Sequence, residues 1–139
     1  MPRVQAAYLA YAAYIDPSGL LSVLGAHVEV VNATQLPWRT QLWIVARLAI
    51  EEPDEGPAVP VAVIVERRDD NERLARLDFT VSVVAQPPGS DPDLPVTFQL
   101  ALPLPLEFRR DGLYRVKLLY NGEEVVDQLL KVRSILPPV

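Results

Sequence analysis

His27 and Glu29, two residues apart in "LGAHVEVV", are the residues best placed to do chemistry. An imidazole beside a carboxylate can hold a metal ion or move a proton. His27 is, however, the only histidine among the 139 residues, and one imidazole with one carboxylate makes a poor metal site. We therefore expect His27 to be a surface or capping residue, and we predict no metal site.

The usual residues of nucleophilic catalysis and phosphate binding are also missing. The absence of cysteine excludes disulfides, thiolate catalysis and cysteine-ligated metal centres. No serine lies in a Gly-x-Ser-x-Gly motif, and His27 is the only base available for a triad. The six glycines are scattered singly rather than grouped in a phosphate-binding loop. The sequence therefore predicts a protein that is not an enzyme and uses no cofactor.

Acidic residues cluster at 51–55 and 69–72, in segments with loop composition. Loop carboxylates can bind calcium, but neither cluster has the spacing of a calcium-binding loop, so we interpret both as solvated turns. The net charge of −5 and the pI of about 4.8 argue against binding to nucleic acid or an anionic membrane.

The N-terminal segment "VQAAYLAYAAYI" is the only stretch that resembles a targeting signal. Tyrosines interrupt it, and Asp16 and Pro17 follow it directly, so it lacks the layout of a signal peptide. No apolar run approaches the roughly 18 residues that a membrane helix needs. We expect a cytoplasmic protein that does not contact the membrane.

Apolar and polar residues alternate along most of the chain, which predicts β-strands. Alternate residues from Val96 to Phe108 share an apolar face, whereas Pro103 and Pro105 lie on the other face, as is typical of an edge strand. The segments 41–50, 61–66 and 77–83 follow the same pattern. A single strand is expected over 20–31, with inward-facing Leu20, Leu24, Ala26, Val28 and Val30.

The first segment is apolar on both faces, and its alanine content makes a helix the competing prediction. We favour a strand covered on both sides, because Asp16-Pro17-Ser18-Gly19 predicts a hairpin turn into Leu20. In this turn Gly19 is a structural residue.

A second hairpin is predicted around Asn121-Gly122. A two-residue turn would place Asp127 opposite Val116 on the apolar face, so we expect a three-residue loop with Gly122 in the left-handed conformation and a bulge. This arrangement places Asp127 opposite Arg115 or Lys117.

Upstream of this hairpin, Asp111-Gly112-Leu113-Tyr114 resembles a tyrosine corner, in which the tyrosine hydroxyl bonds to backbone a few residues earlier. The alternative for Tyr114 is an ordinary half-buried strand aromatic.

Aromatic residues supply the candidate interaction surface. Trp38 follows Pro37 in an expected loop, and Trp43 lies on the polar face of its strand. The apolar first strand adds Tyr8, Tyr11 and Tyr14. Such a surface can dock on a protein or stack on a sugar, whereas the alternative is that loops cover these rings and they complete the core.

Two segments resemble a family of short uncharacterised bacterial proteins, largely actinobacterial, of unknown function. These are "GLLSVLGAH", from Gly19 to His27 after the apolar first segment, and "DGLYRVKLLYNGEEV", from Asp111 to Val125. The resemblance implies an immunoglobulin-like β-sandwich in the bacterial cytoplasm. It supplies no catalytic residues.

Together these patterns predict a single domain over residues 1–139, with no amphipathic helix. We expect an all-β, two-sheet antiparallel sandwich of about seven to eight strands, immunoglobulin-like, with a jelly roll as the alternative. The expected function is a non-enzymatic interaction or structural module that forms a homo-oligomer or docks on a protein partner. The alternative is a binder of a small apolar or carbohydrate ligand.

Overall fold

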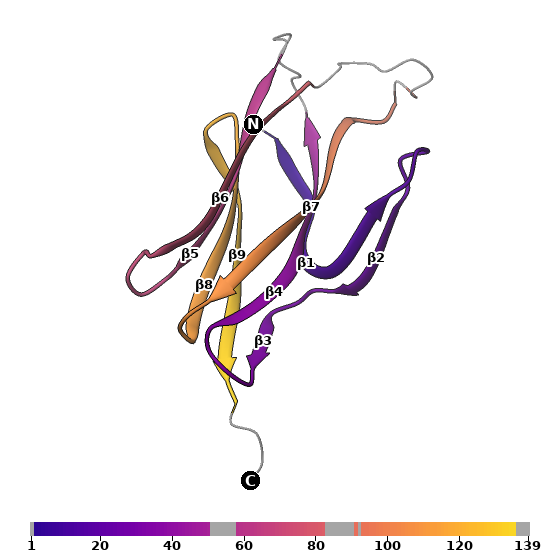
Figure 1. Cartoon of the computed structure of the whole chain (residues 1–139). Coiled ribbons are helices and arrows are strands. Elements are labelled where there is room, and N and C mark those ends of the chain that lie inside the picture. The colour runs from indigo at the N-terminus through magenta and orange to yellow at the C-terminus, as the bar shows by residue number, and fades with distance from the viewer. Residues whose placement is uncertain (1, 51–57, 83–90, 92, 136–139) are drawn as a thin grey trace.

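The computed structural model describes residues 2–50, 58–82, 91 and 93–135 and contains only strands as regular elements there (Figure 1). These strands are β1 (Arg3–Ile15), β2 (Leu21–Ala26), β3 (Val30–Ala33), β4 (Trp38–Ile50), β5 (Val59–Arg67), β6 (Arg73–Val81), β7 (Val96–Phe108), β8 (Gly112–Tyr120) and β9 (Glu123–Ser134). A four-stranded sheet has the order β2-β1-β4-β7, and a five-stranded sheet has the order β3-β9-β8-β5-β6. The prediction of an all-β, two-sheet protein is confirmed, but the prediction that its strands are all antiparallel is wrong, because β3 and β9 pair in parallel.

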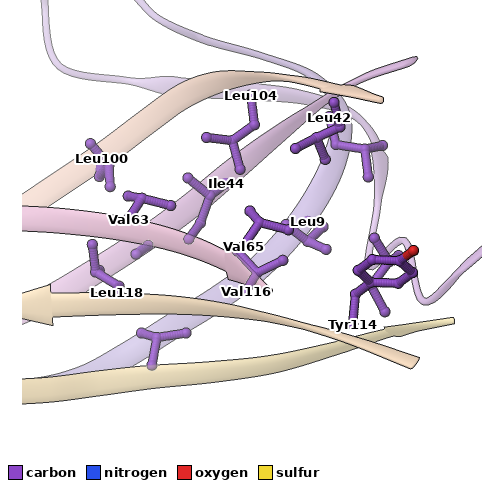
Figure 2. Packing of buried hydrophobic residues seen from close by; sticks show 14 of the residues in the cluster. Leu9, Leu42, Ile44, Val63, Val65, Leu100, Leu104, Tyr114, Val116 and Leu118 are labelled. Carbon is purple, nitrogen blue, oxygen red and sulfur yellow. The ribbon is translucent and has the colours of Figure 1, made fainter. Parts of the chain in front are cut away.

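One apolar core lies between the two sheets (Figure 2). The four-stranded sheet contributes residues such as Leu9, Ile44 and Leu104, and the five-stranded sheet contributes Val63 and Leu118; each is at most 1% exposed. Burying one such side chain stabilises a protein by about 1.5–3 kcal/mol relative to leaving it in water. The alternation of apolar residues along β4, β5, β7 and β8 is thus the main determinant of the sandwich.

The two prolines of β7 lie where the sequence predicts them, on an edge strand. Pro103 pairs with Trp43 and Pro105 with Gln41 on β4, and no strand described in the structure lies along the other side of β7. A proline cannot donate a backbone hydrogen bond, so this position removes no bond from the sheet.

The expected single strand over 20–31 is wrong, because the chain leaves one sheet and enters the other within it. Gly25 and His27 have positive φ angles of 65° and 61°. β2 therefore ends at Ala26, and β3 pairs with β9 in parallel in the opposite sheet. The expected faces are wrong as well, since Leu24 is 72% exposed. This break accounts for the nine strands of the described residues, where seven to eight were expected.

The turn between β8 and β9 is shorter than predicted. Asn121 and Gly122 both have positive φ angles, 52° and 83°, and Tyr120 pairs directly with Glu123, so the loop has two residues. A bulge still restores the match of apolar faces, but it lies further down the ladder, where the register shifts after Leu118. Gly122 has the predicted left-handed conformation, and Lys117 lies opposite Asp127 as expected.

The backbone bond expected for a tyrosine corner is present at Tyr114. The hydroxyl of Tyr114 donates a hydrogen bond of 2.6 Å to the carbonyl oxygen of Arg110. Its ring packs edge-on against Phe108, with 5.0 Å between the ring centroids. Burial raises the pKa of the Tyr114 hydroxyl, so it remains a donor. The next carbonyl along the chain, that of Asp111, accepts bonds from the Arg67 guanidinium, which fixes the approach to β8.

Candidate functional site

β1 changes its pairing partner at Ala10. Its first part, Arg3 to Ala10, pairs with β4, and its second part, Ala10 to Ile15, pairs with β2. Ala10 therefore has a partner on both sides, Trp43 and Ala26. Beyond this residue the hairpin leaves the sheet, as the indigo and violet strands in Figure 1 show. We call residues 11–26 the arm.

The tip of the arm is a tight turn organised by one carboxylate. Oδ1 of Asp16 accepts hydrogen bonds from the backbone N–H groups of Ser18 at 2.8 Å and Leu20 at 2.9 Å, and from the Ser18 hydroxyl at 2.6 Å. The Ser18 hydroxyl, followed by these backbone donors, lowers the pKa of Asp16. Gly19, with a φ of 88°, occupies the left-handed position of the turn. The predicted hairpin turn is thus present.

The arm folds back over the outer face of the four-stranded sheet. Nε2 of Gln99, on β7, donates a hydrogen bond of 3.2 Å to the carbonyl oxygen of Gly19 at the tip. A second, small apolar cluster is buried beneath the arm, with Ala10, Ala13 and Val45 at its centre. Partly buried side chains surround it: Tyr8, Leu21, Val23, Trp43 and Ala101.

Beneath the arm, cross-strand neighbours form rows on the outer face of the sheet. One row joins Ala6, Arg47 and Gln99 across β1, β4 and β7. The tip of the arm lies over this row and borders a partly open cavity of about 340 Å³. Gly19 and Leu20 line the cavity from above, and Tyr8, Val45, Arg47 and Gln99 line it from the sheet. The cavity is thus lined by both apolar and polar side chains.

The side of the arm that faces away from the sheet is apolar and exposed. Tyr14 and Leu24 share this side, because they pair with Ser22 and Ala12 respectively, and they are 62% and 72% exposed. Tyr11, which is 55% exposed, lies at the base of the arm, where its ring covers Gly25. Exposed apolar side chains that gather on one element are typical of a protein interface.

The five predicted surface aromatics do not form one surface. The prediction that Trp38 lies in a loop is wrong. It is the first residue of β4, and it packs, partly buried, against the main core. Tyr8 and Trp43 lie beneath the arm, on the outer face as predicted for Trp43. Tyr11 and Tyr14 alone are largely exposed. Leu24 was missed, because the expected strand placed it inside.

The residues singled out for catalysis or metal binding remain apart. Within residues 2–50, 58–82, 91 and 93–135, no three histidine or carboxylate residues are grouped to hold a metal ion. His27 is exposed, and its ring packs on Tyr8 with 4.7 Å between centroids. In the acidic cluster at 69–72, Asp70 forms ion pairs of 3.3 Å with Arg67 and Arg110. The cluster at 51–55 lies outside the described residues.

The outer face of the five-stranded sheet has a different character, because several ion pairs lie on it. Nζ of Lys117 lies 2.7 Å from Oε1 of Glu66 and 3.5 Å from Oε1 of Glu124. The hydrogen bond to Glu66 raises the pKa of Lys117. Arg76 and Asp78 form another pair at 2.9 Å on the edge strand β6. The exposed apolar side of the arm is therefore distinct from this charged face.

The described residues define an all-β protein of two packed sheets with a hairpin arm. The chain belongs to a family of unknown function (DUF6941), which residues 5–133 match. No curated protein matches the chain. The described part of the chain contains no helix that is long and apolar enough to cross a membrane.

A comparison of solved structures relates the chain to Pseudomonas fluorescens alkylpurine DNA glycosylase AlkC bound to DNA containing an abasic site analog. The similarity extends over 91% of this chain and 30% of that chain, with 12% identity and a TM-score of 0.39. This chain therefore spans less than a third of the length of the protein it resembles.

Proposed function

We propose that this protein is a non-enzymatic interaction module that docks on a second copy of itself, or on another protein, through the outward side of the arm. The observation that supports this function is the pair Tyr14 and Leu24, each more than 60% exposed on the side of the arm that faces away from the sheet. Aromatic side chains on such a surface supply large contact area at low cost in conformational entropy.

A partner bound to the arm would stabilise it. A two-stranded hairpin is marginally stable in water by itself. Here one side of the arm rests on the small cluster around Ala13 and Val45, and the outward side has no described segment of the chain upon it. Covering Tyr14 and Leu24 would bury apolar surface worth about 25 cal/mol per Å².

We also infer an immunoglobulin-like topology for the sandwich. In that fold one sheet contains strands A, B and E and the other contains G, F and C. The order β1-β4-β7 corresponds to A-B-E, and β9-β8-β5 corresponds to G-F-C, with β6 as an added strand beside C. The bond from Tyr114 to Arg110 supports this assignment, because a tyrosine corner occurs near the start of strand F. β2 is then an added strand, which forms the arm together with the end of β1.

Light scattering coupled to size-exclusion chromatography, at two protein concentrations, tests self-association. We expect the unmodified protein to form an oligomer and the variant with Tyr14→Ser and Leu24→Ser to be monomeric. Leu129→Ser is the matched control, because Leu129 is a 44% exposed leucine on the outer face of the other sheet. An oligomer that survives the arm substitutions would contradict docking through the arm.

A monomer at both concentrations would restrict the proposal to a different protein partner. Cross-linking in cell extract would then compare the unmodified protein with the same two variants. Partners retained by Leu129→Ser and lost by the arm variant would support the proposal. Partners captured equally by all three proteins would contradict it.

A further inference from the structure

The cavity beneath the arm has the features of a small-molecule site. Its volume of about 340 Å³ lies within the range of about 300–1,000 Å³ that is typical of such sites. Three elements far apart in the sequence line it: the first strand, the middle of β4 and the start of β7. The tip of the arm forms its fourth side and leaves it partly open to solvent. We infer that this cavity binds a small molecule with an apolar body and one carboxylate.

The apolar part of the ligand has a surface to contact on both sides of the cavity. Val45 and the ring of Tyr8 form the floor, where Val45 is 2% exposed. Leu20 lines the opposite side and is 69% exposed. An exposed leucine at the rim of a cavity gains from being covered, because burying apolar surface is favourable. A ligand between the arm and the sheet would cover it.

The carboxylate has a cation to bind, namely Arg47. In the part of the chain that the structure describes, Arg47 forms neither an ion pair nor a side-chain hydrogen bond. Arg39, on the same strand and the same outer face, instead lies 3.9 Å from the carboxylate of Glu107. A guanidinium binds a carboxylate through two parallel hydrogen bonds, which makes arginine the usual residue for this purpose.

Gln99 and Tyr8 provide the polar groups that orient the ligand. Gln99 neighbours Arg47 in the same row. Its Nε2 donates a hydrogen bond of 3.2 Å to the carbonyl oxygen of Gly19, which holds its carboxamide in place beside the cavity. Tyr8 also lines the cavity and carries a phenolic hydroxyl that can donate or accept a hydrogen bond. A few polar groups around an apolar floor are the usual arrangement of a small-molecule site.

This inference is independent of the proposed docking surface, which lies on the other side of the arm. It is tested by titrating the full chain with octanoate, 1-octanol and octylamine at low ionic strength, followed by two-dimensional NMR. The backbone amides of Gly19 and Leu20 and the side-chain amide of Gln99 report on the cavity. The indole N–H of Trp38 serves as the internal control, because Trp38 is the first residue of β4 and packs against the main core.

We expect octanoate to shift the cavity signals with an affinity about tenfold higher than that of 1-octanol, because a charged hydrogen bond is added. Octylamine should bind less well than 1-octanol. Arg47→Gln should reduce octanoate binding about tenfold to the level of 1-octanol, and Arg47→Lys should retain part of it. Arg39→Gln, the matched control, should bind octanoate as the unmodified protein does.

Several outcomes would overturn the inference. These are equal binding of octanoate and 1-octanol, equal binding by the unmodified protein and Arg47→Gln, or octanoate shifts confined to signals away from the arm. Arg47 is exposed, so its replacement should leave the fold intact. A thermal melt of each variant verifies this, and loss of octanoate binding in a folded Arg47→Gln protein supports the inference.

Discussion

The side-chain amide of Gln99 donates a hydrogen bond of 3.2 Å to the carbonyl oxygen of Gly19, a residue 80 positions earlier in the chain. This bond connects the edge strand β7 to the tip of the hairpin that the first two strands, β1 and β2, form. It is the one hydrogen bond between the tip and the sheet among those of the described side chains. The small cluster around Ala13 and Val45 supplies the rest of the attachment.

Replacing Gln99 should therefore loosen the arm and leave the sandwich intact. Gln99→Ala removes an exposed hydrogen bond, which contributes about 0.5–1.5 kcal/mol. We expect faster hydrogen exchange at the backbone amides of residues 16–21 and unchanged exchange in β5 and β8. Gln41→Ala is the matched control, since Gln41 is exposed on the same outer face. Equal exchange in the two variants would show that the bond does not hold the arm.

Gly25 is required at the base of the arm for two separate reasons. Its φ is 65°, and a Cβ atom at this position would lie 2.6 Å from Cδ2 of Tyr11. Gly25→Ala should destabilise the arm by more than the roughly 1–2 kcal/mol of left-handed strain alone. Gly19→Ala isolates the strain, because Gly19 has a φ of 88° and open space around it.

Hydrogen exchange in residues 11–26 compares the two glycine variants. The Gly25 variant should exchange faster than the Gly19 variant. Adding Tyr11→Ala to Gly25→Ala should remove the difference, because it removes the ring that the new methyl group meets. If the double variant is as loose as Gly25→Ala, contact with Tyr11 is not the cause.

The turn at the tip of the arm should be sensitive to acid. Hydrogen bonds from Ser18 and Leu20 lower the pKa of Asp16 below its ordinary value of 3.8. The stabilisation from Asp16 is therefore complete above pH 3.8 and is lost as the pH falls through the lower pKa of the folded protein. Asp16→Ala should loosen the tip at pH 7, and the difference from the unmodified protein should shrink below pH 3.8.

An NMR titration of the Asp16 carboxyl measures this pKa directly. Ser18→Ala removes the hydroxyl that lowers the pKa most, so the carboxyl should titrate at a higher pH in this variant. An unchanged titration would show that the hydroxyl does not bond to the carboxylate in solution.

Tyr114→Phe should destabilise the whole sandwich. Tyr114 is 1% exposed, and its hydroxyl satisfies the carbonyl oxygen of Arg110. Losing the bond should reduce the free energy of unfolding by about 1–3 kcal/mol, measured by urea denaturation. Tyr11→Phe is the matched control, because it makes the same change at a largely exposed ring.

The unmodified protein and Tyr114→Phe should also differ in how their stability depends on alkaline pH. Burial raises the pKa of Tyr114 above 10.0, so its contribution to stability is complete below pH 10.0 and is lost as the pH rises through the folded value. From pH 9 upward, the free energy of unfolding should therefore fall more steeply with pH for the unmodified protein than for Tyr114→Phe. Parallel curves would contradict a buried, protonated hydroxyl.

Side-chain alternation was sufficient to predict most of the sandwich, because the core lies between two sheets and each inward position excludes water. The faces of β4, β7 and β8 follow from this rule, and so does the edge position of β7, which its prolines require. The Tyr114 bond was predictable for a different reason, since it is local and its donor and acceptor are four residues apart.

Alternation was insufficient wherever the backbone twist changed. His27 adopts a left-handed conformation, which side-chain alternation does not predict, and the chain passes from one sheet to the other around this residue. The bulge near Leu118 was placed in the turn because a one-residue shift can be absorbed anywhere along a ladder. The cavity beneath the arm was not predictable, because it depends on how Gly19 and Gln99 meet across a distance of 80 residues.

The double pairing of Ala10 has a consequence for how this family can vary. Every residue of the arm lies beyond that single alanine, so equal insertions or deletions in its two strands leave the pairing of β1 with β4 unchanged. Side chains alternate with a period of two, so a change of two residues in each strand preserves which side faces outward. The reach of the arm can therefore change in steps of one such unit while the pairing among the other strands stays the same.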